Sequence, residues 1–207
     1  MNFLPKVAVT ALAVLVLASC GGKASTNSAK GDTSASPSSS VSTAPSSTAA
    51  PAGGLSMSGT GYAYHLPKSW EDISAQLKKS QPGIDTGGRA KPATPPFTSN
   101  MNTLTTPSKI SGTPTQSDLD ALASQIKQEV ASLAPNVKTR PVTTIDGAPA
   151  VHQEGQATSA GTKFYLVQYF AVHKGNNYGL TFAFAKNTSP ADRTKVVEPV
   201  LASWKWS

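Results

Sequence analysis

Residues 21–54 restrict the folded part of this 207-residue chain to the residues that follow them. Ser, Thr, Ala, Pro or Gly occupy 29 of these 34 positions, and Val41 is the only larger apolar side chain. A segment of this composition cannot bury enough apolar surface to offset the conformational entropy that folding removes. We therefore predict a disordered linker over 20–54 and one folded domain over 55–207.

The segment before the linker is short and apolar and ends at the only cysteine of the chain, Cys20. Lys6 precedes an apolar stretch over 7–18, which is too short to cross a bilayer as a helix. The string Leu17-Ala18-Ser19-Cys20 places a leucine and two small residues before the cysteine, as in the lipobox of bacterial lipoproteins. We predict that residues 1–19 are removed as a signal peptide and that Cys20 is lipidated. The alternative is an ordinary secretory signal that happens to contain a cysteine.

Lipidation of Cys20 would fix the location of the protein. Each buried methylene contributes about 0.8 kcal/mol, so two or three acyl chains hold a domain stably on a membrane. Random-coil scaling gives the linker a reach of about 30 Å, which carries the domain clear of the lipid headgroups. We expect a lipid-anchored protein on the extracytoplasmic face of the cell membrane, with the membrane itself as one partner.

The charge of the domain argues against a nucleic-acid partner. Residues 55–207 carry 15 Lys or Arg and 10 Asp or Glu, a net charge of +5. The basic residues are scattered, without the clusters and interleaved aromatic residues of a nucleic-acid surface. A mild positive charge is explained equally well by solubility, and we predict no nucleic-acid binding.

Hydrophobic spacing predicts two main helices. Apolar residues recur at helical intervals over 117–134, with Ser117 and Asp120 as the capping pair at the start. A second helix begins at Ser189, with Pro190 in the first helical position, and its apolar stripe continues to Trp204.

About six strands are predicted, and most of them are joined by hairpins, such as the one at Asp146-Gly147. We expect residues 81–99, which are rich in Pro, Gly and Thr and contain Gly87-Gly88-Arg89, to form a long exposed loop. The chain is therefore predicted to be an α+β domain, with an antiparallel sheet flanked by two main helices. The predicted strands cover residues 61–67, 100–105, 137–145, 148–157, 163–173 and 177–186.

Several of these strings resemble the PsbP-like fold, which is shared with Mog-type proteins, and in particular the actinobacterial lipoproteins of the LpqN/LpqT type. The resemblance covers residues 58–206 and implies a PsbP-like α+β domain that serves as a protein-binding scaffold. Its residues are packing and turn residues, so it implies no catalytic or binding residue. The strings that carry it are 61–67 with Trp70, Asn100-Met101-Asn102, Gly147-Ala148-Pro149-Ala150, 165–172, 178–184 and Ser203-Trp204.

The domain offers no catalytic or metal-binding motif. His65, His152 and His173 lie on three different predicted strands without spacing that would bring them together around a metal. No nucleophile elbow joins a strand to a helix, and no cysteine remains for thiol chemistry. Glu154 is expected to lack a second carboxylate for glycoside hydrolysis. The other carboxylates, Glu71, Asp72, Asp118 and Asp120, lie at turns or helix starts, where structural roles explain them.

These observations lead to a prediction of a non-enzymatic binding module without a cofactor or metal, whose partner is another protein of the cell envelope. The alternative is a carrier for an envelope lipid, glycolipid or other small ligand, held between the sheet and its helices. A hydrolytic enzyme is a third possibility, and it requires carboxylates, or a serine and a histidine, to meet in one cleft.

Overall fold

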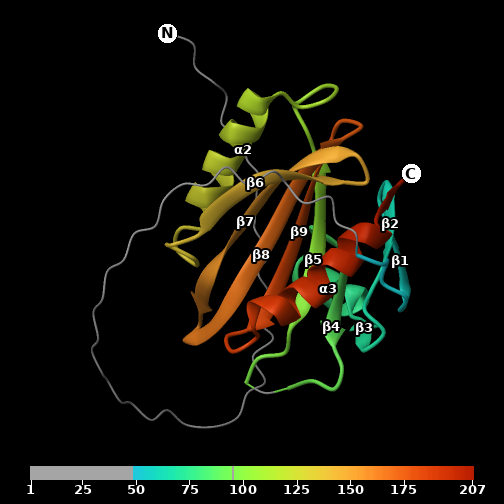
Figure 1. Cartoon of the computed structure of the whole chain (residues 1–207), viewed down its shortest axis with the longest axis vertical. Helices are drawn as coiled ribbons and strands as arrows, with labels where there is room; N and C mark the ends of the chain where they lie inside the picture. The colour runs from blue at the N-terminus through green and yellow to red at the C-terminus, as the bar shows by residue number, and fades with distance from the viewer. Residues whose placement is uncertain (1–48, 95) are drawn as a thin grey trace.

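A computed structural model describes residues 49–94 and 96–207 and confirms the α+β class with an antiparallel sheet (Figure 1). The main sheet has seven strands, all paired in the antiparallel sense. Its order across the sheet is β3 (Trp70–Asp72), β4 (Ile84–Ala90), β5 (Asn100–Pro107), β9 (Asn176–Ala185), β8 (Thr162–His173), β7 (Ala148–Ser159) and β6 (Lys138–Ile145).

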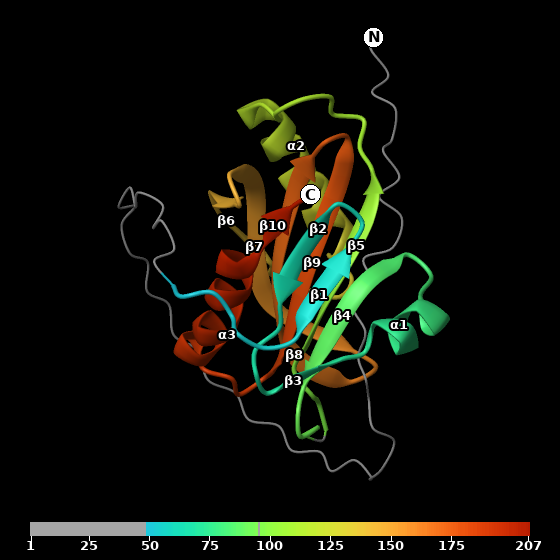
Figure 2. The same ribbon diagram turned by 90° about the vertical axis from the view of Figure 1, so that its right-hand side faces the viewer.

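A second, three-stranded sheet packs over the main one, as Figure 2 shows. Its strands are β1 (Ser56–Gly59), β2 (Tyr62–His65) and β10 (Lys205–Trp206), in the order β1-β2-β10. The described helices are α1 (Ser74–Ser80), α2 (Gln116–Glu129) and α3 (Pro190–Ser203).

Three two-residue turns set the register of β6, β7, β8 and β9. In each turn both residues have positive φ, which is the type I′ geometry that matches the twist of paired strands. At the first turn Asp146 and Gly147 have φ of 45° and 83°. Ala160-Gly161 and Lys174-Gly175 repeat this arrangement at the next two turns. The hairpin at Asp146-Gly147 that the sequence predicts is confirmed.

The main sheet is buried on both faces because its strands alternate between two hydrophobic cores. One core lies under α2 and contains Ile126 together with Leu166 and Phe170 of β8. The other lies under α3 and the small sheet and includes Tyr169 and Phe182. Side chains at even positions of β8 therefore face α2, while those at odd positions face α3.

Trp204 is the centre of the core beneath the small sheet. Its ring is fully buried and is stacked on Tyr62 and Tyr64, with centroid separations of 4.3 Å and 5.3 Å. The hydroxyls of both tyrosines bond to the Thr86 hydroxyl of β4, at 3.0 Å and 3.1 Å. These contacts attach the C-terminal end of α3 and the small sheet to the main sheet.

The prediction of a long exposed loop over 81–99 is wrong, because residues 84–90 form β4 inside the main sheet. A Cβ on Gly87 would collide with the Leu77 side chain of α1 and lie 3.0 Å from the Met101 carbonyl oxygen. Gly88 is equally confined, since a Cβ there would lie 2.7 Å from Leu66. These glycines permit close packing in a strand, whereas in the sequence they suggested flexibility.

Other predicted boundaries also shift. The cap of α2 is Thr115, which forms a capping box with Asp118, and not Ser117 with Asp120. The helix ends at Glu129, five residues before the predicted end at 134. The cap of α3 is Ser189, followed by Pro190, as predicted. The strands β1, β3 and β10 were missed, because they span only two to four residues. Residues 71–80, whose sequence allows one or two helical turns, contain α1.

The described residues just before the predicted domain boundary already contact the fold. The Ala52 amide donates to the Pro199 carbonyl at 2.9 Å, and Ala52 is 9% exposed. The Gly54 amide donates to the Leu66 carbonyl at 3.0 Å. Ala52 therefore contacts the C-terminal half of α3.

Candidate functional site

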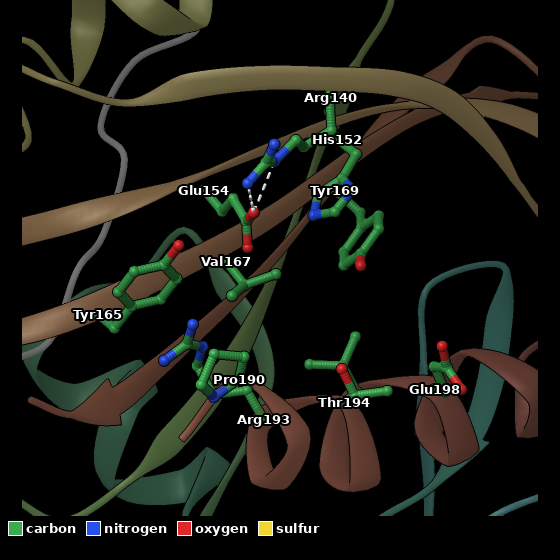
Figure 3. A pocket seen from close by; sticks show the side chains of 11 residues that line it. Arg140, His152, Glu154, Tyr165, Val167, Tyr169, Pro190, Arg193, Thr194 and Glu198 are labelled. Atoms are coloured by element: carbon green, nitrogen blue, oxygen red, sulfur yellow. Dashed lines mark hydrogen bonds and ion pairs between the residues drawn. The ribbon is translucent and has the colours of Figure 1, made fainter. Parts of the chain in front are cut away.

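A groove of about 420 Å³ lies between α3 and strands β6, β7 and β8 (Figure 3). It exists because α3 crosses the face of the main sheet while β6 and β7 extend beyond the helix (Figure 1). We call this hollow the α3 groove. Its lining consists of Pro190, Arg193, Thr194, Val197 and Glu198 from α3, and Arg140, His152, Glu154, Tyr165, Val167 and Tyr169 from the strands.

The floor of the α3 groove is apolar. Val167 and Tyr169 point to the same side of β8 because they are two residues apart, and they are 4% and 7% exposed. Val197 of α3, 4% exposed, meets them from the helix. The charged residues lie around this floor, so the groove combines an apolar base with a polar rim.

An ion pair forms the rim on the strand side. Arg140 of β6 donates from Nε to Glu154 Oε1 of β7 at 2.6 Å, and its Nη2 contacts the same oxygen. The other carboxylate oxygen of Glu154 is directed toward Val167 in Figure 3. Glu154 therefore holds Arg140 through Oε1, and it also has a hydrogen-bonding neighbour in Tyr165 of β8.

Arg193 and Tyr165 close one end of the groove. The Arg193 guanidinium lies 3.6 Å from the centroid of the Tyr165 ring, which is the geometry of a cation–π contact. Arg193 Nη1 also donates to the Thr188 carbonyl at 2.6 Å. The guanidinium is therefore held by the Tyr165 ring on its face and by Thr188 at one nitrogen.

His152 is stacked on Tyr169 beside the Glu154 carboxylate. Their ring centroids are 4.4 Å apart and the planes differ by 16°. Burial lowers the pKa of His152 from 6.5, with a smaller lowering from Arg140, while Glu154 acts in the opposite direction. Its Nε2 is buried and has no hydrogen-bond partner in the described part of the chain. Burial therefore favours the neutral ring, and its Nε2 is a polar atom that the described fold does not use.

The structure brings together residues that the sequence could not connect. Glu154 was expected to lack a carboxylate neighbour, but Glu198 of α3 lines the same groove, and His152 lies there too. The two glutamates are 44 positions apart on a strand and a helix, and only the packing of α3 on β8 relates them. Alternation along β7 places His152 and Glu154 on one face, and this signal was available in the sequence.

The other predicted candidates lie apart from this site. His65 is on β2 and His173 is on β8, stacked on Trp206 at 4.6 Å. Over residues 49–94 and 96–207, no group of three His, Cys, Asp or Glu side chains is arranged to hold a metal. Glu71 pairs with Arg89 at 2.6 Å, in a structural role. Cys20 lies outside the described residues.

Other hollows lack this combination of groups. One of about 540 Å³ lies at the β6–β7 turn and includes His173 and Asp146. Another, of about 610 Å³, lies beside Phe97 and the β7–β8 turn. Within the described part of the chain, no helix is both long and apolar enough to cross a membrane. Of these three hollows, the α3 groove is the one in which carboxylates, arginines and a histidine meet over an apolar floor.

No protein family model matches this chain, and no curated protein matches it in sequence. Solved structures of similar fold include the cyanobacterial PsbP of Synechocystis, with 16% identity, a TM-score of 0.49, and coverage of 71% of this chain and 87% of that one. LpqN of Mycobacterium tuberculosis, involved in cell envelope biogenesis, has 14% identity, a TM-score of 0.49, and coverage of 71% and 84%. PsbP and LpqN, which the sequence resemblance named, are thus among the structures similar to this chain.

A protein of Bacteroides thetaiotaomicron is also similar, with 14% identity and a TM-score of 0.46. The match covers 70% of this chain but only 45% of the Bacteroides protein. The chain therefore spans less than half the length of that relative.

Proposed function

We propose that this protein is a lipid-anchored, extracytoplasmic binding module that holds another cell-envelope protein in the α3 groove. The observation that carries the proposal is the groove itself, where an apolar floor is surrounded by two arginines, two glutamates and a histidine whose Nε2 has no partner among the described residues.

The anchor is supported by the sequence. Leu17-Ala18-Ser19-Cys20 follows a short apolar stretch, and the only cysteine of the chain stands where a diacylglyceryl group would be attached. A linker rich in Ser, Thr, Ala, Pro and Gly then leads to Ala52, which meets the domain on α3 beside Glu198.

A protein partner suits the α3 groove better than an acyl chain does. Both faces of the main sheet are filled by packed side chains, so the interior of the domain is occupied. An acyl chain in the groove would lie against the Arg140–Glu154 ion pair and the Glu198 carboxylate, and it would displace water from them without offering a hydrogen bond. Arginine and tyrosine over a small apolar floor are typical of protein interfaces.

The proposal assigns no catalysis to the two glutamates. Glu154 is bound through Oε1 by two nitrogens of Arg140, so this carboxylate already serves as the partner in an ion pair of the fold. A glycosidase needs one protonated and one ionised carboxyl group facing the same bond. Hydrolysis of a wall polymer by the intact protein, lost in Glu198→Gln, would contradict the proposal.

The test is photo-crosslinking in a host of the native type. A benzoylphenylalanine is placed at Thr194 in the groove and, as a matched control, at Ser124 on the outer side of α2. We expect Thr194 to give a discrete polypeptide adduct, identified by mass spectrometry, that Ser124 does not give. Tyr169→Ala, which removes part of the floor and the stacking partner of His152, should reduce the yield.

Two other results would contradict the proposal. Recurrent adducts with a lipid or glycolipid at Thr194 would favour the carrier function instead. Equal labelling from Thr194 and Ser124 would show that the groove is not the binding face.

A further inference from the structure

Exposed lysines gather at the end of the main sheet where β4, β7 and β9 end and β5 and β8 begin. Hydrogen bonds connect the segments that carry them. The Lys91 amide donates to the Ser69 carbonyl at 2.7 Å, and the Ala185 amide donates to Ser99 Oγ at 3.3 Å. Figure 1 shows the β4–β5 connection and the β7–β8 turn together at the lower end of the sheet. We call this region the lysine end, and its lysines are Lys68, Lys91, Lys163 and Lys186.

The positive charge of the lysine end is not compensated within the described fold. The segments that form it, 66–70, 90–100, 158–163 and 185–189, contain these lysines and no Asp or Glu. Lys68, Lys163 and Lys186 form no ion pair with a described residue. Lys91 Nζ lies 3.6 Å from a Glu71 oxygen, but Arg89 already binds that carboxylate at 2.6 Å. An anionic partner would therefore complement this surface.

The opposite end of the main sheet differs in this respect, because carboxylates accompany its lysines. Asp146 of the β6–β7 turn contacts Lys205 at 2.6 Å, and Asp85 of β4 pairs with Lys78 at 3.8 Å. A solubilising charge needs no such separation between the two ends. The unbalanced lysines thus distinguish one end of the domain from the other.

The hollow of about 610 Å³ beside Phe97 lies within the lysine end. Lys163 of β8 and Lys186, which follows β9, line it together with Asn187. Phe97 is 4% exposed and is stacked on Phe164 with ring centroids 5.2 Å apart, so the inner side of the hollow is firm. Two ammonium groups and an amide around one recess suit a phosphate group, which is negatively charged and accepts several hydrogen bonds.

The predicted linker joins the domain beside this end. The Gly54 amide donates to the Leu66 carbonyl at 3.0 Å, and a Cβ on Gly53 would lie 3.6 Å from Lys68 Cε. A flexible linker holds a domain near its anchor at an effective concentration on the order of millimolar. Weak contacts between lysines and a membrane surface are sufficient under that condition.

We propose that the lysine end rests on the anionic phospholipid headgroups of the membrane that carries the anchor, with one phosphate group in the hollow between Lys163 and Lys186. This inference rests on the lipid anchor of the proposed function and adds an orientation to it. The α3 groove lies on a face of the main sheet and not at its lysine end, so a protein partner can still enter it.

The test measures sedimentation of the full mature chain, residues 20–207, with vesicles. The chain is made without acylation, so that membrane binding does not depend on the anchor. Vesicles of equal parts phosphatidylglycerol and phosphatidylcholine are compared with vesicles of phosphatidylcholine alone. We expect binding to the anionic vesicles only, and its loss when added salt shortens the Debye length from about 8 Å to about 3 Å.

Two double variants, each of which removes two exposed lysines, locate the contact. A lysine near an anionic membrane surface strengthens binding about fivefold, so Lys163→Gln with Lys186→Gln should weaken it about 25-fold. Lys109→Gln with Lys127→Gln is the matched control, because it changes the net charge equally but lies outside the lysine end. The control should weaken binding less than about twofold.

Equal losses in the two double variants, or equal binding to both kinds of vesicle, would overturn the inference. Displacement of the chain from the vesicles by inorganic phosphate at constant ionic strength would also overturn it, because the hollow would then be a site for a small soluble anion. If the lysine end fails these tests while Cys20→Ala still abolishes membrane retention and the Thr194 crosslink persists, the proposed function stands and only this inference fails.

Discussion

The Arg193 guanidinium covers one face of the Tyr165 ring at 3.6 Å and ties the first turn of α3 to β8. Such a contact contributes about 0.5–1 kcal/mol at a partly exposed site. Arg193→Ala should therefore lower the free energy of unfolding by about 1 kcal/mol, measured by urea denaturation. Lys195→Ala is the control, because Lys195 is 74% exposed and pairs only with Asp192. A loss as large in the control would show that the Tyr165 contact contributes little.

Cys20→Ala should leave the chain unprocessed or mislocalised. The acyl chains provide the membrane affinity, so a chain that cannot be lipidated should no longer partition with membranes. Fractionation of cells expressing each chain, with the mass of the processed N-terminus, checks this expectation. Normal processing and membrane retention of Cys20→Ala would contradict the lipoprotein signal.

Gly53 and Gly54 lie where the predicted linker joins the domain, and alanine substitutions at these two positions can be compared directly. A Cβ on Gly54 would collide with the Leu66 carbonyl oxygen and lie 2.7 Å from the Pro67 carbonyl carbon. A Cβ on Gly53 would meet only the Lys68 side chain, at 3.6 Å. Gly54→Ala should therefore destabilise the domain by about 1–3 kcal/mol, while Gly53→Ala should be nearly neutral. Equal thermal stabilities would mean that residues 52–54 do not pack against the domain as described.

His152 should make stability depend on pH in a defined direction. Burial lowers its pKa below the ordinary value of 6.5, so the unfolded chain takes up a proton more readily than the folded chain. Its contribution to stability is present above about pH 6.5 and is lost as the pH falls through the folded-state pKa.

His152→Gln, which cannot titrate, should show a smaller decrease of the unfolding free energy between about pH 7 and pH 5 than the natural chain shows. Urea denaturation at several pH values measures this slope. Parallel profiles for the two chains would indicate that the imidazole titrates alike in the folded and unfolded states.

Local patterns predicted the elements that local chemistry determines. The β6–β7 hairpin follows from Asp146-Gly147, and the start of α3 follows from Ser189 and Pro190, because turn and cap residues act over a few positions. The strand β4 was missed because Gly87 and Gly88 have low strand propensity, and the close approach of Leu77 and Leu66 that requires them is tertiary.

The α3 groove was beyond prediction for the same reason. The spacing of His152 and Glu154 shows that they lie on one face of β7. Arg193 and Glu198 come close to them only because α3 packs on that face of the main sheet, opposite to the face that α2 covers. The register of β6 with β7 adds Arg140, and a bulge between Arg140 and Thr143 helps to set that register. Long-range packing of this kind leaves no periodic signal in a single sequence.

The most direct test of the account is hydrogen–deuterium exchange of the lipidated full chain on vesicles made from membranes of a native-type host. Matched vesicles made from the extracted lipids alone separate contacts with protein from contacts with lipid. We expect added protection in peptides of α3 and of β8 around Val167 on the protein-containing vesicles only, with α2 unchanged. Protection over α2 instead, or equal protection of α3 on the lipid-only vesicles, would contradict a protein-binding α3 groove.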